Sequence, residues 1–84
     1  MSDYLLTCRS LTYAQRARKV LERYGQRAVI MKTPQEISSR GCGYGLRLIR
    51  GNPRSAVNAL RRAGVGPERV FLLTDDGGVK EAVF

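Results

Sequence analysis

The order of strand-like and helix-like segments is the feature that most limits how this chain can fold. Runs rich in β-forming residues occupy positions 4–8, 27–32, 44–50 and 69–74. One stretch with helical spacing follows the first run, and another follows the third. This β-α-β-β-α-β order predicts an α+β domain of the ferredoxin-like class. Such a domain packs two helices on one face of a four-stranded antiparallel sheet, whose first and third strands are central and adjacent.

The helix boundaries are marked by capping residues. The stretch NPRSAVNALRRAG, residues 52–64, has Asn52 as its N-cap and Gly64 as its C-terminal stop. For the first helix, either Ser10 or Thr12 is a suitable N-cap. The apolar residues of both stretches recur at helical spacing, so we expect each helix to bury one face.

Length and composition predict one domain over residues 1–84. Its short tail, residues 75–84, is predicted to form a turn followed by an end that is either loose or paired with the edge of the sheet. The N-terminal residues contain an acidic side chain and no long apolar run, which argues against a secretory signal or a membrane span. We therefore expect a cytoplasmic protein whose thiols stay reduced. Two cysteines and no histidine predict neither a disulfide framework nor a metal site, and no cofactor is expected. A Cys–His hydrolase is excluded as well.

The formal net charge of +8 favours anionic partners, such as nucleic acid, a phosphate-bearing ligand or an acidic protein surface. Most of the 15 basic residues are arginines, and they are spread along the chain instead of forming a block. A general compositional bias toward arginine explains such a distribution equally well. Whether the basic charge is functional stays open from the sequence.

The stretch SSRGCGYGLRL, residues 38–48, contains the best candidate for a reactive group. Gly41 and Gly43 flank Cys42, which leaves its sulfur accessible and its backbone free to move. Arg40 and Arg47 are near enough in sequence to stabilise a thiolate. Such a thiol can accept and hand over a group or sense an oxidant. The alternative is a small buried residue at the start of a strand.

The predicted pairing of the first and third strands brings Cys8, at the end of the first strand, close to Cys42. Cys8 follows an apolar run and is therefore expected to be a packing residue. Its functional alternative is a resolving thiol that forms a transient disulfide with Cys42.

Residues 40–47, RGCGYGLR, also match part of the motif found on the third strand of RNA-recognition domains. Cys42 and Arg47, however, stand where that motif has aromatic residues that stack on bases. Strand alternation offers a better arrangement, in which Tyr44, Leu46 and Leu48 face the helices and Arg47 points outward. The sequence therefore disfavours an RNA-binding sheet.

Three segments together resemble a family of small bacterial proteins described as selenium/sulfur carrier-like. They are SLTYAQRARKVLERYG, MKTPQEISSRGCGYGLRL and RVFLLTDDGG, and the resemblance covers roughly residues 4–75. Its most specific parts are Thr33-Pro34, Ile37-Ser38 and Cys42-Gly43. Relatives place the cysteine directly after the serines, whereas Arg40 and Gly41 intervene here.

The resemblance implies a carrier that holds sulfur or selenium as a persulfide or selenosulfide on Cys42, and not an enzyme. Gly41 and Gly43 would admit the partner's thiol, while Arg40 and Arg47 would lower the pKa of the Cys42 thiol and attract an acidic partner. The implied partners are a cysteine desulfurase-type donor and an acceptor protein, with the carrier as monomer or homodimer. The alternatives are a basic nucleic-acid-binding module and a small regulatory domain with a structural cysteine.

Overall fold

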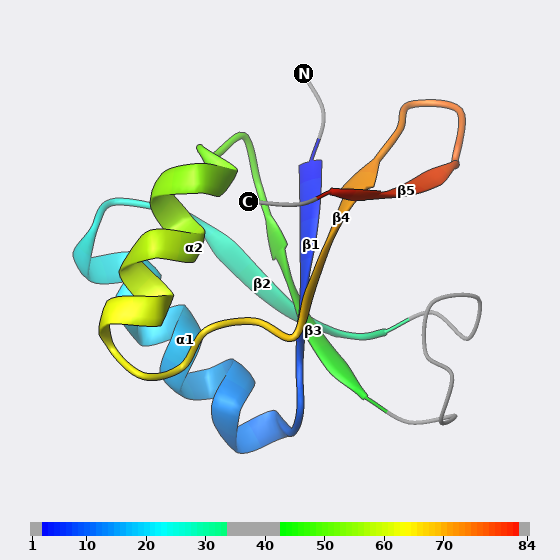
Figure 1. Ribbon diagram of the computed structural model, residues 1–84. Coiled ribbons are helices and arrows are strands. Elements are labelled where there is room, and N and C mark those ends of the chain that lie inside the picture. Colours follow the sequence, from blue (N-terminus) through cyan, green and yellow to red (C-terminus); the bar gives the residue numbers. More distant parts are fainter. Residues whose placement is uncertain (1–2, 34–42, 83–84) are drawn as a thin grey trace.

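The computed structural model describes residues 3–33 and 43–82, and it shows two helices against an antiparallel sheet (Figure 1). The elements are β1 (Asp3–Cys8), α1 (Leu11–Arg23), β2 (Ala28–Lys32), β3 (Tyr44–Leu48), α2 (Pro53–Arg62), β4 (Arg69–Leu73) and β5 (Val79–Ala82). The strands run in the order β2-β3-β1-β4-β5. The α+β class and the central, antiparallel β1–β3 pair are thus confirmed. Neither helix has the length and apolar character needed to cross a bilayer.

The prediction of four strands was wrong, because the tail forms a fifth strand. The Asp76 carboxylate accepts hydrogen bonds from the Thr74 hydroxyl and from the Gly78 N–H. Gly77 adopts a φ of 86°, and the Thr74 N–H donates to the Gly78 carbonyl at 2.9 Å. This tight turn sends residues 79–82 back along β4, so β5 forms although its sequence, VKEA, contains only one strong β-former.

Side-chain caps begin both helices. The Ser10 hydroxyl accepts a hydrogen bond from the Tyr13 N–H at 3.3 Å, which identifies Ser10, and not Thr12, as the N-cap of α1. The Asn52 side chain accepts from the Ser55 N–H at 3.1 Å, as the sequence predicts. Each cap satisfies one of the N–H groups that a helix leaves without an internal partner.

The core lies between the helices and one face of the sheet. Leu6 of β1 and Leu46 and Leu48 of β3 point toward the helices and have no exposed surface. Burial of such side chains is the main favourable contribution to folding. The helices contribute small and branched apolar residues to the same cluster: Ala14, Ala17, Leu21, Ala56, Val57 and Leu60.

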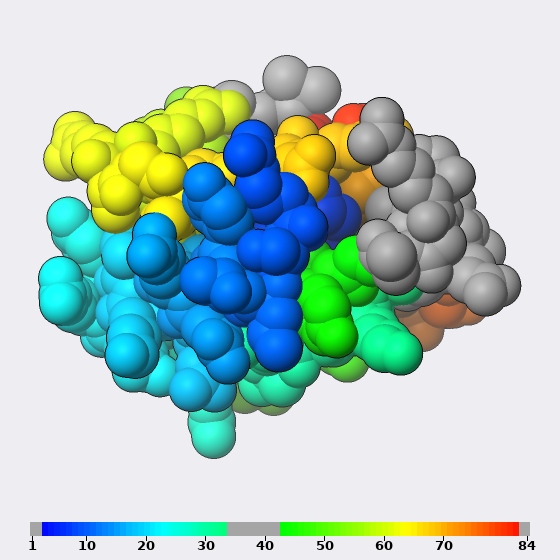
Figure 2. All heavy atoms as spheres, turned by 90° about the horizontal axis from the view of Figure 1, so that it is seen from below, coloured from blue at the N-terminus to red at the C-terminus, as the bar shows by residue number. Residues whose placement is uncertain are grey.

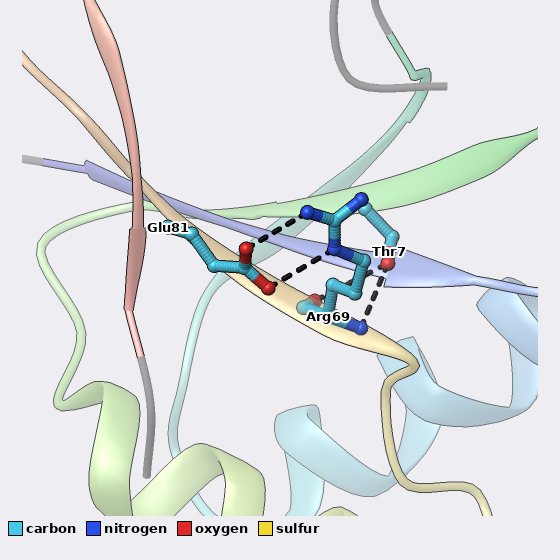
Figure 3. Close-up of polar contacts among 3 residues, drawn as sticks. All are labelled: Thr7, Arg69 and Glu81. Atoms are coloured by element: carbon cyan, nitrogen blue, oxygen red, sulfur yellow. Dashed lines mark hydrogen bonds and ion pairs between the residues drawn. The ribbon is translucent and has the colours of Figure 1, made fainter. Parts of the chain in front are cut away.

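Both described helices lie on one face of the sheet, and the other face carries paired charged side chains (Figure 3). Arg69 of β4 binds both carboxylate oxygens of Glu81 on β5, at 3.0 and 2.8 Å. The Thr7 hydroxyl accepts from the Arg69 N–H at 2.9 Å and donates to the Arg69 carbonyl at 3.3 Å. On the β3 side, Arg47 and Asp3 form an ion pair at 2.7 Å. These contacts join β3, β1, β4 and β5.

The two ion pairs predict an acid-sensitive component of stability. Hydrogen bonds from Arg47 and Arg69 lower the pKa of Asp3 and Glu81, respectively. A carboxylate with a lowered folded-state pKa adds stability above its unfolded pKa, which is about 4, and that stability is lost as the pH falls through the folded value. Glu81→Gln should therefore lower the free energy of unfolding in urea at pH 7 but not at about pH 2.

Glu22→Gln is the matched control for Glu81→Gln. Its carboxylate is an exposed partner of Arg18 at 3.7 Å within α1, a type of pair that contributes little. An equal loss of stability in both variants at pH 7 would contradict the role given to the Arg69–Glu81 pair.

Candidate functional site

The segment that contains the candidate thiol leaves and rejoins the sheet at one point. The Thr33 N–H, directly after β2, donates to the Gly43 carbonyl, directly before β3, at 3.0 Å. The next residues along, Lys32 and Tyr44, are paired in the β2–β3 ladder. Residues 34–42, with Arg40, Gly41 and Cys42, lie outside the described residues. The structure therefore defines the base of this segment.

Cys8 lies beside this base, as the sequence predicts. It pairs with Tyr44 in the β1–β3 ladder, and paired Cα atoms in such ladders are about 4.5–5.5 Å apart. In the sequence, Cys42 comes two residues before Tyr44. A disulfide between Cys8 and Cys42 stays a prediction, because Cys42 is outside the described residues.

The Cys8 thiol itself is part of the core. Cys8 is 7% exposed and packs with Leu6 and the helices. The Cys8 Sγ lies 3.8 Å from the Leu6 carbonyl oxygen. Burial, with a smaller effect from the nearby Glu68 carboxylate, raises the pKa of the Cys8 thiol to about 11. A thiol in this setting is protonated at neutral pH and is a poor nucleophile. These properties favour the packing interpretation of Cys8.

The start of α1 lies at the same end of the sheet. Figure 2 shows the first residues of α1 (blue) side by side with the start of β3 (green). The first turn of α1 contains no acidic residue, so nothing there offsets the positive end of the helix dipole. Arg9, between Cys8 and the Ser10 cap, lies over the Tyr13 ring at 5.0 Å. Sequence reasoning missed Arg9, although its position directly after Cys8 marks it as a neighbour of the site.

Arg47 lies on the opposite face of the sheet from Cys8. Its guanidinium binds the Asp3 carboxylate at 2.7 and 2.8 Å, and Asp3 also accepts a hydrogen bond from the Arg50 N–H. Along β3, Arg47 is three residues beyond Tyr44, which is about 10 Å. The contact that the structure shows for Arg47 is the one with Asp3 of β1. An effect of Arg47 on the Cys42 thiol stays a prediction.

The faces of β3 agree with the predicted alternation. Tyr44, Leu46 and Leu48 pack toward the helices, and Arg47 is exposed on the other face. Gly45, beside Arg47, has no side chain, and a Cβ there would lie 2.8 Å from Leu5 Cδ1. The outward face of β3 thus presents no aromatic side chain on which a nucleic-acid base would stack.

Metal ligation has no support among residues 3–33 and 43–82. No group of three or more His, Cys, Asp or Glu side chains is placed to hold an ion in this part of the chain.

The burial of Cys8 predicts slow alkylation of its thiol, which can be measured in a variant without Cys42. In Cys42→Ser, native Cys8 should react with iodoacetamide much more slowly than in urea, because the core excludes the reagent. Its rate should keep rising with pH toward about 11. Rapid labelling that levels off near pH 8 would show that Cys8 is accessible and ionises normally. Mass spectrometry of quenched samples measures the rate.

Comparisons with curated proteins and with solved structures gave no match. A family model matches residues 3–72, which include the five elements from β1 to α2 and most of β4. The match thus covers the central strands, both helices and the whole segment between β2 and β3. The chain belongs to the family described as putative Se/S carrier protein-like.

Proposed function

We propose that this protein carries sulfur or selenium on Cys42, as a persulfide or selenosulfide. The observation that carries the proposal is the base of the segment that contains Cys42. The hydrogen bond between the Thr33 N–H and the Gly43 carbonyl joins both ends of that segment at the end of the β2–β3 ladder. The start of β3 lies next to the first residues of α1 (Figure 2). Membership of the Se/S carrier-like family supports the same function.

The chemistry is a pair of thiol exchanges without net oxidation. The Cys42 thiolate attacks the outer sulfur of a donor persulfide, R–S–SH. A new S–S bond forms on Cys42 as the donor's S–S bond breaks, and the donor leaves as a thiolate. An acceptor thiolate then attacks the outer sulfur on Cys42 and regenerates the Cys42 thiolate. With selenium, the carried group is –S–SeH.

The surrounding residues have separate roles in this scheme. Gly41 and Gly43 admit the partner's sulfur, and Arg40 stabilises the Cys42 thiolate. We add Arg9 and the N-terminal N–H groups of α1 as further positive charge at this end of the sheet. Arg47, which is bound to Asp3, acts less directly. The protein has no turnover of its own, and its partners are a cysteine desulfurase-type donor and an acceptor protein in the cytoplasm.

The architecture suits a carrier because the segment that contains Cys42 begins and ends at one pair of hydrogen-bonded strands, β2 and β3. We assign the ferredoxin-like arrangement to β1, α1, β2, β3, α2 and β4, with β5 added at the edge. Cys8 serves this arrangement as a core residue. A resolving role would require the end of β1 to open, because the Cys8 thiol is buried and protonated.

Sulfur loading tests the proposal directly. Incubation with a persulfide-loaded desulfurase should add one sulfur atom to the chain, measured as intact mass before and after reduction. Cys42→Ser should abolish the added mass, because the accepting thiolate is gone. Cys8→Ala is the matched control and should keep it.

Two outcomes would contradict the proposal. One is the absence of added sulfur on the unaltered chain when the donor is active on another acceptor. The other is undiminished loading of Cys42→Ser. Loss of loading in Cys8→Ala, with its fold intact by circular dichroism, would transfer the carrier role to Cys8.

A further inference from the structure

The free edge of β2 is a surface on which another strand can pair. The Thr33 N–H donates to Gly43, and the Ile49 N–H donates to Arg27, so these residues form hydrogen-bonded pairs at the two ends of β2. Hydrogen-bonded pairs alternate in an antiparallel ladder. The N–H and C=O groups of three residues therefore point away from the sheet: Ala28, Ile30 and Lys32. Over the described parts of the chain, no strand pairs with this side of β2.

The two edges of the sheet differ in how well they resist pairing. Exposed edges are usually protected by charged side chains, proline or shortness. The other edge, β5, has four residues and carries Lys80 and Glu81 in its centre. β2 has five residues, AVIMK, and its only charge is at its end. Val29, on the face without helices, is 48% exposed, an unusual value for a large apolar side chain in this molecule.

We propose that β2 pairs with β2 of a second copy of this chain, antiparallel and about a two-fold axis at Ile30. In this register Ile30 faces Ile30, and Ala28 of each copy faces Lys32 of the other. The outward groups then form about six backbone hydrogen bonds between the copies. Val29 of each copy packs beside Met31 of the other.

The sequence of β2 fits a second copy because it is self-complementary in this register. Apolar residues meet apolar residues, and no two like charges stand opposite each other, an arrangement that would oppose pairing. The same two-fold contact uses the same patch on both copies, as the commonest homodimers do. The two sheets become one continuous sheet of ten strands.

The dimer is expected to be weak and to depend on salt in a characteristic direction. A single strand pair buries less than the roughly 1,200 Å² of a standard stable interface. Each copy also has a net charge of +8, so the copies repel each other at low ionic strength. Association should therefore strengthen as salt is added, whereas binding of a polyanion to a basic surface weakens with salt.

The dimer is independent of the carrier function. Thr33, the last described residue before the segment with Cys42, comes three residues after Ile30. In the dimer the two Thr33 residues therefore lie on opposite sides of the two-fold axis. They are thus about 20 Å apart along the paired strands. Each thiol segment remains at its own end of the interface, so failure of sulfur loading and failure of dimerisation are separate results.

Sedimentation velocity on the whole chain tests the proposal, over a concentration series up to about 1 mM and at two salt concentrations. A reductant is included so that disulfides form no dimers. The unaltered chain should shift from monomer toward dimer with concentration, and more so at high salt. Val29→Lys, which places a charge next to the axis, should weaken association at least tenfold.

A pair of edge prolines provides the matched control. Ala28→Pro removes an outward N–H of β2 without removing a bond to β3, and it should abolish the dimer. Val79→Pro does the same on β5, because the bond between Thr74 and Gly78 leaves the Val79 N–H pointing outward. This second variant should dimerise like the unaltered chain. Circular dichroism checks that each variant folds.

Three results would overturn the proposal. The chain stays monomeric throughout the series, or its association weakens as salt is added. The third result concerns the variants. If Val29→Lys folds and dimerises like the unaltered chain, and Val79→Pro does not dimerise, the interface lies on β5.

Discussion

The burial of β1 on both sides is the constraint on which the structure depends. β1 is hydrogen-bonded to β3 and β4, and residues 5–8 are all buried. Leu6 and Cys8 face the helices, while Leu5 and Thr7 lie on the opposite face from α1 and α2. Leu5 nevertheless has no exposed surface, and its neighbour Phe71 is 5% exposed. The absence of a side chain at Gly45 leaves the space that Leu5 occupies.

The end of the same strand sets the environment of the Cys8 thiol. Cys8 ends β1 inside the core, where burial raises the pKa of its thiol. Cys42 belongs to the segment that starts and ends at the neighbouring strand pair. For the proposed carrier an unreactive Cys8 is an advantage, because a second reactive thiol next to Cys42 would discharge the persulfide as a disulfide.

Much of the fold follows from local patterns in the sequence. The order of elements, the Asn52 cap and the inward side of β3 depend on residues close together in the chain, so they were predictable. β5 was foreseen only as one of two possibilities for the tail, because VKEA pairs through its backbone after the turn at residues 75–78 and its side chains give no strong strand signal. The partner of Arg47 was also hidden, since Asp3 is distant in sequence and only the β1–β3 register brings them together. At the site, the position of Cys8 beside the start of β3 was predictable from topology, whereas Arg9 was overlooked.

The ion pairs of Arg47 and Arg69 show that the net positive charge is not spread evenly over the surface. Arg69 lies 4.8 Å from the Phe71 ring and is bound by Glu81, and Arg47 is bound by Asp3. An anion that approaches this face has to compete with the carboxylates of Asp3 and Glu81 for the two arginines. If it drew the arginines away, it would expose the apolar side chains beneath them. The face is therefore electrically almost balanced despite its guanidinium groups. The excess positive charge of the molecule resides mainly on the two helices, which carry seven basic side chains and one acidic side chain, so its electric field is asymmetric.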